Sequence, residues 1–384
     1  MKNIWPIFWL LTAGATSFVF SADPPPLTKI APAVYQRTVF LGDSITDGNT
    51  YPLLVRGALQ QADLPSMVAI NAGIGGDTAA GMQKRLARDV LDHRPTLATL
   101  SAGANDVLRG VTVEDYERRL RAIANELREA KIPLVLLTPN IMAGKLMKKA
   151  DEGLKAYETA IRRVATDFGL RVAEVRQRQE EAQIRGVQQL AADDLHPNYE
   201  GQRSIARAVL DALGYTELTV PERPQLSTLA GIISPWQMRP WAGKEPLPHS
   251  DSLRAAKVDG SWKELVLPLG PPAKPVESDN RWLDDFRQLG GAIALPERIG
   301  AGNRFLGLAT IESDQKKKVQ FNTGADLQLL WLNGQLLYQP VEIRGWHIGR
   351  QSVAAELAPG KNTVLILCGS TFFLSVTDGP MWGE

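Results

Sequence analysis

The hydrophobic positions of the chain follow one pattern up to residue 215 and a different pattern after it. Up to that point, short apolar runs alternate with longer stretches in which apolar residues recur every three or four positions. The short runs predict buried strands, and the periodic stretches predict amphipathic helices. The predicted strands are residues 39–41, 68–71, 97–102, 134–138 and 170–174. Because such alternation is typical of a parallel sheet with helices on both faces, we expect an α/β domain over residues 29–215.

The second pattern begins with a proline-rich segment, residues 216–259. Its prolines stand at positions 221, 224, 235, 240, 246 and 248. Proline at this density predicts a connection with little regular structure of its own. Trp236 and Trp241 lie within it and indicate that it packs against a neighbouring domain.

Residues 260–384 contain short apolar runs separated by turn residues. Asn333-Gly334 between two of these runs is a strong hairpin signal. We predict strands at residues 262–267, 306–312, 317–322, 327–332, 335–338, 352–357, 363–368 and 372–377. Short strands at this spacing are typical of an all-β sandwich or jelly-roll domain.

The first 22 residues have the features of a secretory signal peptide. Lys2 precedes an apolar run over residues 4–20, and small residues follow at the predicted cleavage point. An uncleaved membrane anchor is the alternative, because the run is close to the length that spans a bilayer. Asp23 and three prolines directly after it favour cleavage. We therefore expect export to a periplasm, a cell surface or the medium, with no stable membrane span afterwards.

Composition excludes several classes of function. The chain has 384 residues, enough for two domains, and its 43 basic and 42 acidic residues give a net charge of +1. This balance gives no electrostatic reason to expect nucleic acid or an anionic membrane as a partner. Cys368 is the only cysteine and lies in an apolar run, so we expect a core side chain, with no internal disulfide and no cysteine nucleophile.

One serine stands where open α/β sheets bind their ligands. Ser44 follows Gly42-Asp43 at the end of the first predicted strand. Most serines at such turns only cap a helix. A nucleophilic serine also needs a base, a group that orients the base, and donors directed at the developing oxyanion.

A base and its orienting carboxylate are present on one loop. The chain has four histidines, and His196 alone lies in the α/β region on a loop with a carboxylate three residues before it, Asp193. In a turn, this spacing lets Asp193 reach Nδ1 of His196 and direct the other ring nitrogen toward the serine. Asp194 would then point elsewhere.

Two further stretches provide candidate oxyanion donors at the same edge of the sheet. Glycines at 73, 75 and 76 follow the second predicted strand and let a backbone N–H come close to a ligand. The stretch lacks the lysine of a phosphate-binding loop and the spacing of a dinucleotide fingerprint. Asn105 follows the third predicted strand and adds an amide side chain.

Together these four stretches resemble the SGNH hydrolases, the GDSL-type lipase/esterase superfamily. The matching stretches are Gly42-Asp43-Ser44-Ile45-Thr46, Gly73-Ile74-Gly75-Gly76-Asp77-Thr78, Gly103-Ala104-Asn105-Asp106 and Asp193-Asp194-Leu195-His196-Pro197. The resemblance covers residues 37–215 and implies a flavodoxin-like, three-layer α/β/α domain with five parallel strands. It implies a nucleophile, a base, an orienting acid and two oxyanion donors, which are Ser44, His196, Asp193, Gly76 and Asn105. It implies no cofactor and no metal.

The β-region resembles the galactose-binding-like jelly rolls of secreted carbohydrate enzymes. The resemblance lies in residues 317–336, above all in Trp331-Leu332-Asn333-Gly334. Those domains often have an acidic-glycine turn before this strand, whereas this chain has Gly324-Ala325-Asp326. A packing or spacer domain without a ligand is the alternative.

These resemblances imply an exported serine esterase that hydrolyses short acyl esters, above all O-acetyl esters of a carbohydrate. A lysophospholipase or thioesterase acting on lipid acyl esters is one alternative, and acyl transfer to a sugar hydroxyl is another. A glycan-binding protein with an inactive hydrolase domain is a third. The complete set of five site residues argues against the third alternative.

Overall fold

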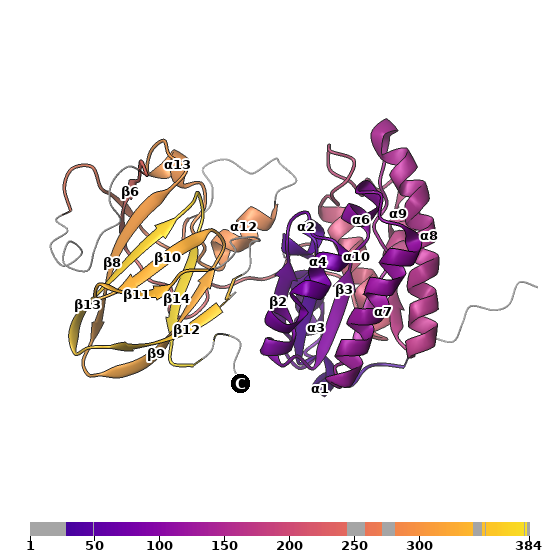
Figure 1. Ribbon diagram of the computed structural model, residues 1–384, viewed down its shortest axis with the longest axis horizontal. Helices are drawn as coiled ribbons and strands as arrows, with labels where there is room; N and C mark the ends of the chain where they lie inside the picture. The colour runs from indigo at the N-terminus through magenta and orange to yellow at the C-terminus, as the bar shows by residue number, and fades with distance from the viewer. Residues whose placement is uncertain are drawn as a thin grey trace, which may run out of the picture.

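The computed structural model describes residues 28–48, 50–243, 258–270, 281–340, 348–349, 351–379 and 381. The predicted signal peptide, residues 1–22, lies outside them. Figure 1 shows an α/β domain and a β-domain side by side. Among the described residues, no helix has the length and hydropathy needed to cross a membrane.

The first domain is built on a sheet of five parallel strands in the order β2-β1-β3-β4-β5. Its strands are β1 Arg37–Gly42, β2 Val68–Gly73, β3 Leu97–Ser101, β4 Leu134–Leu137 and β5 Arg171–Ala173. The five predicted strands are thus confirmed, as is the flavodoxin-like α/β fold. The strand order changes direction at β1, and open α/β sheets bind their ligands outside the carboxyl ends of the strands at such a point.

Helices cover both faces of this sheet, because neighbouring strand residues point to opposite sides. Val39 and Leu41 of β1 join one buried cluster, whereas Phe40 between them joins the other. Helices α4, α5, α7 and α8 pack on the first cluster, and α3 and α10 pack on the second. The helices are α1 Pro32–Tyr35, α2 Ser44–Asp47, α3 Thr50–Gln61, α4 Ala79–Lys84, α5 Leu86–Asp89, η1 Leu91–His93, α6 Ala104–Leu108, α7 Val113–Glu129, α8 Gly144–Phe168, α9 Val175–Ile184 and α10 Tyr199–Ala212.

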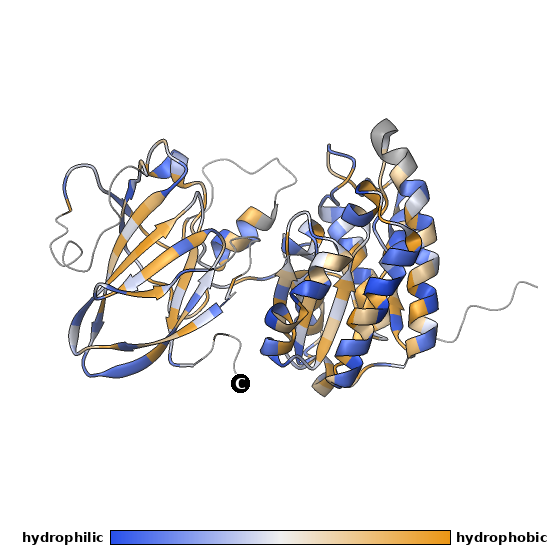
Figure 2. Ribbon diagram, in the orientation of Figure 1, coloured by the Kyte–Doolittle hydropathy of each residue, from blue (hydrophilic) through white to orange (hydrophobic). Residues whose placement is uncertain are grey.

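The second domain consists of two antiparallel sheets. Six strands follow the order β11-β10-β13-β8-β6-β7, and three follow the order β12-β9-β14. Cys368 is fully buried in the apolar cluster that includes residues of both sheets, as predicted. In Figure 2, hydrophobic colour dominates the strands of both domains. The strands are β6 Trp236–Pro240, β7 Lys263–Leu265, β8 Phe305–Ser313, β9 Lys317–Gly324, β10 Leu327–Leu332, β11 Gln335–Tyr338, β12 Gln351–Leu357, β13 Gly360–Cys368 and β14 Phe373–Thr377.

The segment 216–259 has more regular structure than its prolines predict. β6 lies inside this range and pairs with β7 and β8. Its alternate residues Trp236 and Met238 are fully buried, which is the period of a strand that faces a core. Pro235 and Pro240 stand before the strand and at its last position, so they remove no N–H from its interior. Helices α12 Arg281–Gln288 and α13 Leu295–Arg298 likewise interrupt the predicted run of strands.

The β-domain packs directly against the helix that follows the Ser44 turn. Leu53 of α3 is buried in one apolar cluster with Phe286, Leu289 and Phe373 of the second domain. Gly57 on the same helix leaves room for Pro221, because a Cβ there would lie 3.2 Å from the proline ring. The two domains are therefore joined by a hydrophobic contact and not only by the chain.

Candidate active site

Ser44 lies at the carboxyl end of β1, where the chain turns into α2. Asp43 caps this short helix: its Oδ1 accepts a hydrogen bond from the Ile45 N–H at 3.0 Å. Gly42 permits a close approach, since a Cβ there would lie 2.0 Å from the Thr46 hydroxyl oxygen. The turn presents a half-buried Ser44 side chain at the carboxyl end of β1.

The predicted base and orienting acid lie in line with this hydroxyl. Ser44 Oγ is 2.8 Å from His196 Nε2, and His196 Nδ1 is 2.6 Å from Asp193 Oδ2. Partial burial alone would raise the pKa of Asp193, but hydrogen bonds from the His196 ring and from the His196 and Leu195 N–H groups lower it. The structure thus brings together the three residues that sequence spacing predicted.

The loop that carries His196 is fixed through its backbone. Leu190 and Pro197 form a β-bridge, and the His196 carbonyl accepts a hydrogen bond from the Ala191 N–H at 2.8 Å. Asn140 Nδ2 donates to the Leu195 carbonyl at 3.0 Å. The His196 and Asp193 side chains nonetheless remain 41% and 52% exposed. The backbone therefore sets their position while both side chains keep access to water.

Asp194 lies away from His196, as expected if Asp193 is the carboxylate that orients the base. Its backbone has a φ of 59°, and its carbonyl accepts a hydrogen bond from the Ala143 N–H. Its carboxylate lies beside Gly144, where a Cβ would be only 2.3 Å from Oδ2.

Gly76 occupies the third position of a tight turn after β2. The Asp77 N–H donates to the Ile74 carbonyl at 3.1 Å, and Gly76 has a φ of +75°, which is the geometry of a type II turn and favours glycine. Across the described part of the chain, neither the Ser44 N–H nor the Gly76 N–H donates to another residue. Both groups are therefore available to a bound carbonyl oxygen.

Asn105 lies in the first turn of α6, after β3. Its Nδ2 is 3.4 Å from Asp43 Oδ2, so the residue next to the nucleophile orients the amide. Burial raises the pKa of Asp43 to about 6, against the hydrogen bond from the Ile45 N–H and the nearby His196. Asn105 has a second amide hydrogen that can serve a ligand.

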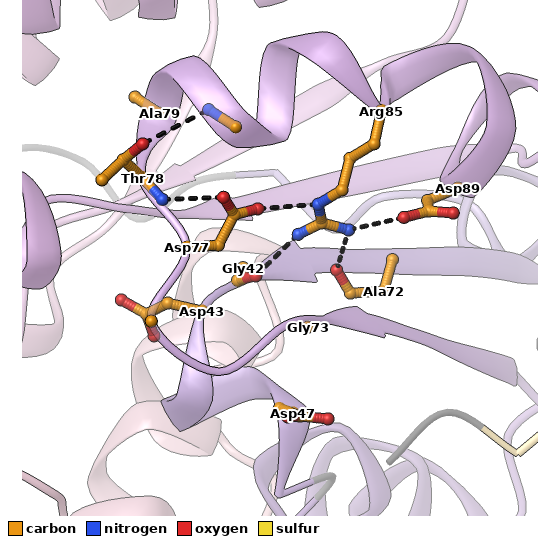
Figure 3. Close-up of polar contacts among 12 residues, drawn as sticks. Gly42, Asp43, Asp47, Ala72, Gly73, Asp77, Thr78, Ala79, Arg85 and Asp89 are labelled. Carbon is orange, nitrogen blue, oxygen red and sulfur yellow. Dashed lines mark hydrogen bonds and ion pairs between the residues drawn. The ribbon is translucent and has the colours of Figure 1, made fainter. Parts of the chain in front are cut away.

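Arg85 connects the ends of β1 and β2 to the Gly76 turn (Figure 3). This arginine is buried, and its guanidinium donates to the Gly42 carbonyl at 2.9 Å and to the Ala72 carbonyl at 2.7 Å. It also binds Asp77 at 2.7 Å and Asp89 at 2.9 Å. Arg85 lies between α4 and α5. Sequence reasoning missed it, because a charged residue in a stretch predicted to be an amphipathic helix ordinarily faces solvent.

A second carboxylate fixes the start of the helix that follows the turn. Both carboxylate oxygens of Asp106 accept from the Ala79 N–H, at 3.1 and 3.2 Å. Burial raises the pKa of Asp106 to about 6, against this hydrogen bond. Gln202 of α10 likewise links the Tyr51 N–H and the Ile45 carbonyl, and no sequence signal pointed to it. In the described ranges, no group of three or more histidine, cysteine or acidic residues could hold a metal ion.

Comparisons with known proteins find relatives of the first domain among lipases, acylhydrolases and esterases. Residues 40–204 match the model of the GDSL-like Lipase/Acylhydrolase family. An acetylxylan esterase of Geobacillus stearothermophilus is 26% identical over 208 residues, which are 47% of this chain and 94% of that protein. Thioesterase 1/protease 1/lysophospholipase L1 of Escherichia coli K12 is 26% identical over 180 residues, 45% of this chain and 81% of that protein. The crystal structure of an acetylxylan esterase from Geobacillus stearothermophilus covers 47% of this chain and 94% of its own, with 24% identity and a TM-score of 0.43.

The family match and the sheet define the class of protein. Residues 40–204 form a GDSL-like lipase/acylhydrolase domain of the SGNH type. The chain is a carboxylic ester hydrolase with acetylxylan esterases among its homologues, and it acts on acyl esters.

Proposed function

We propose that this hydrolase is an exported serine esterase that removes short acyl groups, above all O-acetyl groups, from a carbohydrate. The observation that carries the proposal is the 2.8 Å contact between Ser44 Oγ and His196 Nε2, with Asp193 on the other ring nitrogen at 2.6 Å. The three residues act as a nucleophile, a general base and the acid that orients the base.

The mechanism is acyl transfer from an alcohol to water. His196 takes the proton of Ser44 as its Oγ attacks the ester carbonyl, and returns that proton to the departing alcohol. Water then attacks the acyl group on Ser44 with the same base, which restores the free enzyme. General-base catalysis of this kind contributes ~10²–10⁴ in rate.

The negative charge of each tetrahedral intermediate needs donors that are already in place. The N–H groups of Ser44 and Gly76 and the side chain of Asn105 supply them. Each such donor contributes ~10²–10³ in rate. Neither backbone N–H has another hydrogen-bond acceptor among the described residues, so neither must break a bond to donate to the oxyanion.

Two observations support a carbohydrate ester as the substrate. A relative that matches over 94% of its own length is an acetylxylan esterase. The β-domain resembles galactose-binding-like jelly rolls in its Trp331-Leu332-Asn333-Gly334 stretch. The signal-like residues 1–22 support export, where polymeric carbohydrates are found.

A lipid acyl ester is the second candidate, because another relative bears the name thioesterase and lysophospholipase. Hydrolysis of p-nitrophenyl acetate and p-nitrophenyl laurate by protein beginning at residue 23 separates the two. We expect rapid cleavage of the acetate and little of the laurate, followed by release of acetate from acetylated xylo-oligosaccharides. A preference for laurate would contradict the carbohydrate ester and favour a lipid acyl ester as the substrate.

Ser44→Ala tests the mechanism itself. We expect a loss of about 10³-fold or more in kcat, since the nucleophile is removed while binding remains. Ser261→Ala is the matched control, because this exposed serine of the β-domain bonds only to Asp259 among the described residues. Equal rates for Ser44→Ala and the unchanged protein would exclude the Ser44 mechanism.

A further inference from the structure

Arg109 forms hydrogen bonds to Gly76 and Asn105, the two candidate oxyanion donors that lie outside the Ser44 turn. It directly follows α6, and its backbone N–H donates to the Asn105 carbonyl at 3.1 Å. Its guanidinium reaches across to the turn after β2, where Nη2 donates to the Gly76 carbonyl at 2.6 Å. One residue thus connects the α6 turn that carries Asn105 with the turn that carries Gly76.

The Gly76 turn needs such a contact to hold one conformation. Its two central residues are Gly75 and Gly76, and glycine has the largest conformational freedom of all residues. Asp47 Oδ2 accepts from the Gly75 N–H at 3.2 Å on one side of the Gly75–Gly76 peptide. Arg109 binds the Gly76 carbonyl on the other side. The peptide that carries the Gly76 N–H is therefore anchored at both flanks.

We propose that Arg109 is a positioning residue of the esterase, which fixes the Gly76 N–H relative to the Asn105 amide so that both donors meet the same oxyanion. This inference rests on the proposed function, because it assigns a role within that oxyanion site. Arg109 acts through Gly76 and does not itself touch the reacting atoms. Donors of this kind lose their effect when they are displaced by more than about 0.5 Å.

The contact has little importance for the stability of the fold. Arg109 is exposed, and an exposed hydrogen bond or ion pair adds little to the free energy of unfolding. Within the turn, Asp77 is held separately by Arg85 at 2.7 Å. A substitution of Arg109 should therefore change kcat without changing the stability of the fold.

The experiment compares three variants on p-nitrophenyl acetate. For Arg109→Ala we expect kcat to decrease by about tenfold, which is less than the effect of removing one oxyanion donor entirely. KM should stay within about twofold, and Tm should not change. Arg109→Lys retains most of kcat, because a single N–H serves the Gly76 carbonyl. Arg118→Ala is the matched control, since Arg118 is an exposed arginine on the next helix, paired with Asp115 at 2.7 Å; its kinetics stay unchanged.

Other outcomes would overturn the inference. A higher KM with unchanged kcat would make Arg109 a substrate-binding residue, and a lower Tm in parallel with kcat would make its role structural. A lysine variant as slow as the alanine variant would also contradict it. If Ser44→Ala is inactive while Arg109→Ala is fully active, only this inference fails. If Ser44→Ala is active, the proposed function fails first.

Discussion

The carboxylates that hold the loops of the oxyanion donors are buried, whereas the acid and the base on the other side of the Ser44 hydroxyl face solvent. Asp43 and Asp106, which hold the loops of the oxyanion donors, are 2% and 1% exposed. Asp193 and His196, the acid and the base, have side chains that are 52% and 41% exposed. The pKa values follow the same division: burial raises that of Asp43, while hydrogen bonds outweigh burial and lower that of Asp193.

The difference corresponds to what each side must do in the reaction. Oxyanion donors stabilise charge only if they are fixed before the charge develops, so buried hydrogen bonds on their loops are useful. The base must exchange protons with alcohol and water, so it benefits from exposure. We therefore expect substitutions on the exposed side to change activity with little effect on stability. Substitutions of the buried residues on the oxyanion side should change stability as well, whereas substitution of the exposed Arg109 should not.

The exposed side gives the largest expected effect. Asp193→Asn should decrease kcat by about 10²–10⁴-fold, because the amide no longer stabilises a protonated His196 or sets its tautomer. The free energy of unfolding should change by less than about 1 kcal/mol, as for other exposed pairs. Steady-state kinetics and urea unfolding of the same preparation measure both quantities.

Asp194→Asn is the control for this substitution. It makes the same chemical change one residue further along, where the carboxylate lies beside Gly144 and not beside His196. Its kcat should stay within about twofold of the unchanged protein, since it does not touch the base. If the two variants lost activity equally, Asp193 would not be the residue that orients His196.

Arg85 provides the corresponding test on the buried side. Replacing Arg85 by Met should lower the free energy of unfolding by about 3–5 kcal/mol, because Asp77 and the Gly42 and Ala72 carbonyls lose a buried partner. Activity should fall too, since Asp77 lies next to Gly76. Urea unfolding gives the first quantity and kcat gives the second.

Arg88→Met is the matched control for Arg85. Arg88 also binds Asp89, but it is 38% exposed, and we expect a loss of about 1 kcal/mol or less. A comparable loss for both variants would contradict the distinction between buried and exposed sides.

Arg85 also marks the limit of what could be predicted from the sequence. Ser44, Gly76, Asn105, Asp193 and His196 were found because each lies in a short motif at the end of a predicted strand or before the last helix, and the structure brings them to one edge. The contacts of Arg85 with Gly42 and of Arg109 with Gly76 join positions 43 and 33 residues apart. Such contacts form only in the folded protein, so no local sequence pattern predicts them.

The strands show the same limit. The five strands of the α/β domain were predicted because buried parallel strands are continuous apolar runs. β6 was missed because it has only two buried alternate positions, Trp236 and Met238, and prolines stand before the strand and at its last position. Its partner β8 lies far along the chain, and that pairing, not the local sequence, makes Trp236–Pro240 a strand.

The pH dependence of stability gives the smallest expected effect and separates the two sides once more. Burial raises the pKa of Asp106 to about 6 from 3.8, so folding favours its protonated form. Its contribution to stability is therefore fully present below pH 3.8 and is lost as the pH rises through about 6. From pH 4.5 to pH 7 this loss amounts to about 2 kcal/mol for such a group. Asp193 has the opposite sign, because its lowered pKa adds stability above its usual range and loses it in acid.

Asp106→Asn makes this difference measurable by urea unfolding at pH 4.5 and pH 7. The asparagine oxygen can still accept from the Ala79 N–H, so the loop keeps its anchor while the titrating group is removed. We expect the decrease in unfolding free energy between the two pH values to become smaller in the variant. If Asp106→Asn left the decrease unchanged, the burial of Asp106 would not be its cause.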